Sequence, residues 1–180
     1  MKYGDVSLGE GEAIINKLGG MSGDEAFLRG DKVLCDKKAR IPSAVAVDLD
    51  ADPFIPEGWE LIEHERRGHV KWGECAWHLF VAENQRQDKY TVPGVELRRQ
   101  LRIWDTANAN LLDFLLRNPS RIPTGFGRGL NIGFWGTLYH NSDGLLTIRT
   151  LRRSANKWTE GYAFVGEWFS SSSPALILDR

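Results

Sequence analysis

The chain has 180 residues, with 23 Lys and Arg against 24 Asp and Glu, four His and two Cys. This length suits one compact domain with at most a small appended module. A hydrophobic content of 42% and a charged content of 26% exclude a disordered or fibrous chain, and the net charge of −1 argues against a bulk polyanion binder. Seven Trp, eight Phe and four Tyr form an aromatic surplus.

The small net charge hides an uneven distribution. Residues 1–70 hold nine Lys and Arg against 14 Asp and Glu, a net charge of −5, whereas residues 71–180 hold 14 against ten, a net charge of +4. The two halves therefore attract each other within one fold or mark two different surfaces.

The sequence also indicates a compartment. Residues 1–20 contain no apolar stretch of signal-peptide length, and no window approaches the roughly 18 apolar residues that cross a bilayer. Cys35 and Cys75 have no CxxC partner, which favours reduced thiols. We expect a cytoplasmic protein without a membrane partner.

The first 35 residues predict a small helical module. Ser7 with Glu10 and Ser22 with Glu25 match the capping box that begins a helix, and glycine pairs or single glycines follow each segment. A charged stretch that ends in Ile41-Pro42 then separates this module (1–35) from a second domain (41–180).

The second domain begins with strand patterns. Residues 44–50 alternate apolar and acidic side chains, as expected of a half-buried strand. Residues 59–64 and 69–82 predict two strands of one hairpin that turns near Arg66-Arg67-Gly68.

Two helices and a meander follow. Residues 94–104 and 109–117 predict helices, the second capped by Asn108 and apolar nearly all round, which indicates burial. The last fifty residues predict an antiparallel meander with strands at 132–140, 145–153, 158–165 and 175–178. The expected fold class is α+β: a small N-terminal helical module and a mainly antiparallel sheet domain with two helices.

The meander carries the candidate binding residues. Aromatic side chains on the strands at 132–140 and 158–165 are interleaved with arginines on the strand at 145–153, and six of these residues form the candidate site: Trp135, Tyr139, Arg149, Arg153, Trp158 and Tyr162. Such a surface could stack single-stranded bases while guanidinium groups hold phosphates. The alternative is that these rings close the hydrophobic core and the arginines are ordinary surface residues.

Two weaker patterns point to chemistry. His64, His69, Cys75 and His78 lie within fifteen residues and supply four zinc-type donors, but Cys75 and His78 fall on opposite faces of a predicted strand.

Asp48 and Asp50 follow an apolar strand, as does the aspartate pair of phosphoryl-transfer enzymes of the haloacid dehalogenase type. The simpler interpretation is that the two aspartates lie on a solvated acidic strand face. We expect neither a metal nor a cofactor.

Several segments resemble a family of small modular bacterial proteins from environmental and candidate-phylum genomes, to which no activity is assigned. They are Asn16–Gly20, Phe27–Gly30, Ile55–Glu60, Asn108–Leu116, Ile132–Tyr139 and Asp143-Gly144. The resemblance spans most of the chain and implies a module placed ahead of different C-terminal parts. It fits an adaptor role and transfers no catalytic residue.

The leading hypothesis is a non-enzymatic binding or adaptor protein that recognises another protein through the aromatic-rich sheet. The alternatives are a single-stranded nucleic-acid-binding protein that uses the Arg and aromatic face, and a hydrolase or phosphotransferase that uses Asp48, Asp50 or His64.

Overall fold

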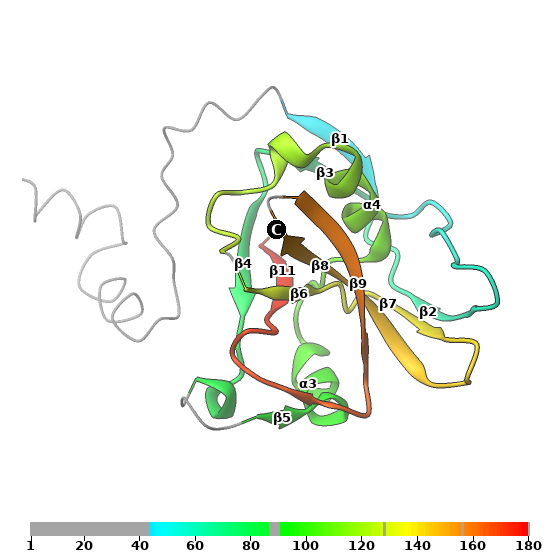
Figure 1. Ribbon diagram of the computed structural model, residues 1–180. Helices are drawn as coiled ribbons and strands as arrows, with labels where there is room; N and C mark the ends of the chain where they lie inside the picture. Colours follow the sequence, from blue (N-terminus) through cyan, green and yellow to red (C-terminus); the bar gives the residue numbers. More distant parts are fainter. Residues whose placement is uncertain (1–43, 87–90, 128, 156, 180) are drawn as a thin grey trace, which may run out of the picture. The chain divides into compact units, whose positions relative to one another are not determined.

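The computed structural model describes residues 44–86, 91–127, 129–155 and 157–179, all of which belong to the unit Ile41–Arg180 (Figure 1). The helical module predicted over residues 1–35 lies outside the described residues. Within the described part, two α-helices and eleven short strands form a mixed α and β structure in which strands predominate.

The helices are α3 (Gly94–Leu101) and α4 (Ala109–Arg117), with short 3-10 turns η1 (Glu83–Gln85) and η2 (Pro119–Arg121). The strands in chain order are β1 (Val45–Asp48), β2 (Glu60–His64), β3 (His69–Trp72), β4 (Ala76–Phe80), β5 (Val92–Pro93), β6 (Asn131–Gly133), β7 (Thr137–His140), β8 (Leu146–Ser154), β9 (Lys157–Phe164), β10 (Trp168–Phe169) and β11 (Ala175–Asp179).

The main sheet is organised around β8. Its order is β2-β7-β8-β6-β11-β4, and β9 pairs with β8 along its whole length. β6 and β7 pair with different parts of β8, because the chain leaves the ladder between Gly133 and Thr137. β1 pairs with β3 and β5 pairs with β10 in separate two-stranded sheets. β11 runs parallel to β6, so the sheet is mixed although most of its pairs are antiparallel.

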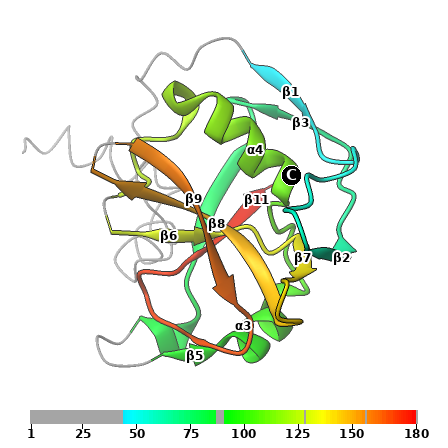
Figure 2. The ribbon, with the colours of Figure 1, turned by 45° about the vertical axis from the view of Figure 1, so that its right-hand side comes forward.

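Two hydrophobic clusters lie on opposite faces of this sheet. The first joins β1, β3 and α4 to the sheet, and the second joins α3, β5 and β10 to it. Successive residues of β11 alternate between them: Leu176 and Leu178 enter the first cluster, whereas Ala175 and Ile177 enter the second. Figure 2 shows α4 and α3 on their separate sides of the strands.

Several predicted elements are confirmed. The 44–50 pattern forms β1, and the apolar segment 109–117 forms α4, with Leu111, Leu112 and Leu115 fully buried. The predicted turn at 141–144 forms as expected, because Asn141 Oδ1 accepts the Asp143 N–H and Gly144 adopts a positive φ of 74°.

The predicted pairing of strands was wrong in two places. Residues 59–82 do not form a hairpin: β2 pairs with β7, β3 pairs with β1, and β4 pairs with β11. A turn at Gly73, with φ of 104°, divides β3 from β4 and sends them to different sheets. The last strand, β11, does not extend the meander beside β9 but lies between β6 and β4.

The start of α4 differs from the expected cap. The Asn108 side chain accepts no bond from its own helix; its amide instead donates to Leu49 O at 2.8 Å and to Glu65 O at 3.1 Å. The Ala109 N–H donates to Thr137 Oγ1 of β7 at 3.0 Å. The helix start is therefore fixed by tertiary contacts, which align α4 over the sheet.

Candidate functional site

A buried arginine lies in the middle of β8. Arg149 is only 2% exposed, and its Nη2 donates to Asp113 Oδ1 of α4 at 2.6 Å while its Nε donates to Glu160 of β9. Its guanidinium carbon lies 5.3 Å from the centre of the Phe54 ring. One side chain thus connects the helix, two strands and the loop that precedes β2.

The two carboxylates stabilise the charge of this arginine. Burial opposes that charge, but the hydrogen bonds to Asp113 and Glu160 outweigh it and raise the pKa of Arg149 above its ordinary value. The Asp113 and Glu160 side chains keep 13% and 25% exposure, so the cluster reaches solvent on their side. Apolar packing would avoid the desolvation cost of such a cluster, which favours a positioning role over a purely stabilising one.

An aromatic patch lies beside this cluster. We define it as Phe54, Ile55, Trp59 and Tyr162. Phe54, Ile55 and Tyr162 are 57%, 43% and 48% exposed, and Trp59 is half-buried. The Trp59 ring centre lies 4.8 Å from that of Tyr162 and 5.9 Å from that of the buried Tyr139. These contacts hold the rings in fixed positions at the surface.

The loop that carries the patch is tied to the sheet. The Tyr139 hydroxyl donates to the Phe54 carbonyl oxygen at 3.0 Å. Burial raises the pKa of Tyr139 to about 12, so this hydroxyl keeps its proton at neutral pH. Burial, followed by the neighbouring Glu160, also raises the pKa of Tyr162. The aromatic side chains of the patch are therefore uncharged at neutral pH.

The segment that carries the patch is rich in acidic residues. Residues 44–65, which include its loop, contain seven Asp and Glu and no Lys or Arg. Glu57 and Glu60 are exposed within this segment, and Glu160 adds a carboxylate from β9. Three of the seven carboxylates are paired with arginines outside the segment: Asp52 with Arg66, Glu63 with Arg98 and Glu65 with Arg67. The exposed Glu57 and Glu60, which flank Trp59 in the sequence, carry the acidic charge of the patch. The patch is thus both aromatic and acidic.

The structure divides the six candidate residues of the meander. Trp135, Tyr139 and Arg149 are 5%, 0% and 2% exposed, so they are not accessible binding residues, and the two rings belong to the core as the alternative interpretation expected. Trp135 packs against Phe169 in the second hydrophobic cluster, because the chain leaves the ladder between β6 and β7.

The other three residues lie at two places along β9. Tyr162 belongs to the aromatic patch. Arg153 is exposed and lies opposite Trp158, with its guanidinium carbon 5.7 Å from the centre of that ring. The Arg153–Trp158 pair lies at the turn between β8 and β9, away from Tyr162.

His64 takes part in a structural network. Its Nδ1 lies 2.8 Å from Thr137 Oγ1, and its Nε2 lies 3.2 Å from Leu49 O. Since a carbonyl oxygen only accepts, Nε2 carries the proton and Nδ1 accepts from the Thr137 hydroxyl, which in turn accepts from Ala109 N. Burial lowers the pKa of His64, in keeping with a neutral ring.

The aspartate pair makes backbone hydrogen bonds, one local and one to the distant Gly68. Asp48 Oδ1 accepts the Asp50 N–H at 2.9 Å, and Asp50 Oδ1 accepts the Gly68 N–H at 2.6 Å. His64 is held instead by Thr137 and Leu49. The three residues of the hydrolase hypothesis thus have separate structural partners.

The zinc-type donors do not gather in one place. His69 faces Asp48 at 3.8 Å, and His78 bonds Asp179 on β11 at 3.0 Å. Cys75 packs against the first hydrophobic cluster. Among the described residues, no group of three His, Cys, Asp or Glu side chains is arranged to hold a metal ion.

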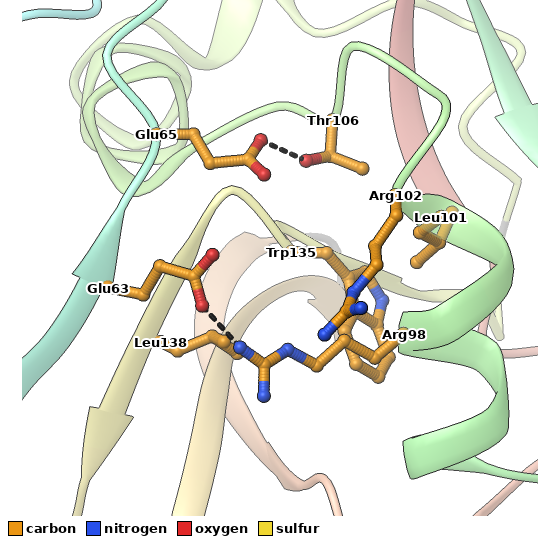
Figure 3. Close-up of a pocket in the computed structure, with 8 residues that line it drawn as sticks. All are labelled: Glu63, Glu65, Arg98, Leu101, Arg102, Thr106, Trp135 and Leu138. Carbon is orange, nitrogen blue, oxygen red and sulfur yellow. Dashed lines mark hydrogen bonds and ion pairs between the residues drawn. The ribbon is translucent and has the colours of Figure 1, made fainter.

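A small pocket lies on the other side of β2, between β2 and α3 (Figure 3). Arg98 of α3 reaches across it and is ion-paired with Glu63, and Arg102, directly after α3, also lines it. The Thr106 hydroxyl donates to Glu65 at 2.9 Å. The interior of about 30 Å³ has room for about two water molecules, and two of its charged groups, Arg98 and Glu63, are engaged with each other.

Sequence reasoning missed four residues of the site: Phe54, Trp59, Asp113 and Glu160. Two signals were available. Asp113 is the one charged residue in the apolar run Leu111–Leu116, and a carboxylate there requires a buried partner. Phe54 and Ile55 lie between two prolines in a loop, where rigid backbone presents apolar side chains to solvent.

Comparison with protein-family models, with curated proteins and with solved structures found no match to this chain. In the described part, no helix has the length and apolar character needed to cross a membrane. The function is therefore argued from the geometry of the patch.

Proposed function

We propose that this chain is a binding or adaptor protein that recognises a basic segment of another protein through the aromatic patch. The observation that carries the proposal is the exposure of Phe54 and Tyr162 beside Trp59, on a loop anchored through Arg149 and Tyr139. Trp and Tyr are the residue types that most often supply binding energy at protein interfaces.

The charges around the patch define the partner. A Lys or Arg side chain gains from contact with an aromatic face and from the exposed carboxylates of Glu57 and Glu60. An acidic partner would meet like charge over the same area. A basic segment with some apolar side chains therefore suits the surface best.

The anchoring of the loop supports binding over a merely exposed cluster. Ordering a surface side chain on association costs about 0.5–1.5 kcal/mol, and a surface fixed beforehand avoids much of this cost. Tyr139 holds the Phe54 backbone, and the Arg149 guanidinium lies against its ring. The cluster of Arg149, Asp113 and Glu160 thus places a guanidinium against the exposed Phe54 ring, a cation–π contact that an apolar side chain could not make.

Selection of short random peptides on the immobilised chain tests this proposal. Enriched peptides should carry Lys or Arg together with an aromatic or aliphatic residue. Their affinity, measured by calorimetry, should fall by about tenfold or more in Phe54→Ala, as expected for a central interface residue, and should weaken with added salt.

Trp168→Ala provides the matched control, because Trp168 is an exposed aromatic residue, 67% accessible, on β10 away from the patch. It should leave the affinity unchanged. Enrichment of acidic peptides, or equal loss of binding in the Trp168 and Phe54 variants, would contradict the proposal.

A further inference from the structure

A second surface has the opposite charge. Residues 117–131 and 150–159 contain five Arg and one Lys and no Asp or Glu, on a chain whose net charge is −1. We define the basic end as four exposed side chains of these segments: Arg117, Arg152, Arg153 and Lys157. It is independent of the aromatic patch and of the function proposed for it.

The fold brings the two segments together. The first runs from the end of α4 to β6, and its Asn131 pairs with Arg152 of β8. Trp158 of β9 packs against the hydrophobic cluster that includes Leu115 and Ile122. Figures 1 and 2 both show the turn between β8 and β9 on the side where α4 ends.

The charges of the basic end are available for a partner. Two exposed arginines of α3 are paired: Arg98 with Glu63, and Arg99 with Glu96. By contrast, none of the four side chains of the basic end forms an ion pair within the described structure. The nearest carboxylate along β9, that of Glu160, is engaged with Arg149.

A planar group accompanies these charges. The Arg153 guanidinium lies over the half-buried Trp158 ring at 5.7 Å. Stacked guanidinium and indole planes are surfaces on which an unpaired base can stack, while neighbouring cations hold phosphates. In a double helix the bases are stacked on one another, so only the phosphates could interact with the basic end.

We propose that the basic end binds single-stranded nucleic acid, with phosphates at Arg117, Arg152 and Lys157 and a base stacked at the Arg153–Trp158 pair. The recognition is by charge and stacking, so it carries little sequence preference. An acidic protein segment would satisfy the charges but not the stacking plane.

Fluorescence anisotropy with labelled oligouridine and oligothymidine tests the proposal on the full chain. Binding should be measurable at low salt and should weaken as salt rises, with a slope of log K against log salt of about −2 to −3, as expected for three or four phosphate contacts on a single strand. The same probes as a duplex should bind more weakly.

Two variants locate the site. Arg152→Ala/Arg153→Ala/Lys157→Ala should weaken binding by about tenfold or more. The control Arg98→Ala/Arg99→Ala/Arg102→Ala on α3 removes the same formal charge and should retain the affinity. The conservative variant Arg153→Lys keeps the positive charge but loses the planar guanidinium group. It should bind the oligonucleotide more weakly, with the same slope of log K against log salt.

Thermal melting of each variant establishes that it is folded before binding is interpreted. The proposal is overturned if the two triple variants weaken binding equally, if duplex binds as tightly as single strand, or if polyglutamate competes as well as oligonucleotide at equal charge. Absence of binding at low salt would overturn it as well. None of these outcomes affects the peptide measurements at the aromatic patch.

Discussion

Replacement of Arg149 by methionine tests the claim that a buried charge positions the aromatic patch. Methionine retains much of the side-chain length but leaves Asp113 and Glu160 as neighbouring carboxylates without their cation. Removal of one partner from a buried ion pair costs about 3–5 kcal/mol. Because Glu160 keeps 25% exposure and can turn toward solvent, we expect a loss at the lower end, about 3 kcal/mol at neutral pH.

Urea unfolding followed by tryptophan fluorescence measures this loss, since the chain contains seven Trp. Addition of Asp113→Asn and Glu160→Gln to the methionine variant should recover part of the stability at neutral pH.

Two results would refute this reasoning. A loss below about 1 kcal/mol would place the cluster in the range of exposed ion pairs. A loss that is not relieved by the two amide substitutions would mean that packing, not charge, was removed.

Three further variants probe the packing around the patch and on the opposite face of the sheet. Tyr139→Phe removes the bond to the Phe54 carbonyl and should cost about 1 kcal/mol in urea unfolding while weakening peptide binding. Burial lowers the pKa of His64 below 6.5, so the unfolded chain binds a proton at His64 more tightly than the folded chain does. The neutral His64 ring therefore contributes its full stabilisation above pH 6.5, and this contribution is lost as the pH falls toward the pKa of the folded state. His64→Gln should remove this part of the pH dependence of the free energy of unfolding. Gly94→Ala brings a Cβ to 2.5 Å from the Phe169 ring and should lower stability by about 1–3 kcal/mol in the same assay; an unchanged midpoint would show that the ring yields freely.

Local features of this fold could be predicted from the sequence. β1, α4 and the turn at 141–144 follow from alternation, an apolar run and turn chemistry, each of which acts within a few residues. Strand pairing could not be predicted in the same way, because β2, β3 and β4 find partners far along the chain.

The candidate site shows the same division. That aromatic and basic residues concentrate in the meander was visible in the sequence, but which of them stay exposed depends on the break between β6 and β7 and on where α4 lies. Arg149 is buried because α4 packs over this face of the sheet and its Asp113 accepts a hydrogen bond from the guanidinium. Phe54 and Trp59, which lie outside the meander, become part of the site through a loop that folds back over β8 and β9.

The most direct test of the account is nuclear magnetic resonance of the labelled chain during titration with a selected basic peptide. The account predicts that the Trp59 indole signal and the amide signals of Phe54 and Tyr162 move in a saturable manner, while the Trp168 indole signal stays in place. Movement at Trp168 with no change at Trp59 would contradict it.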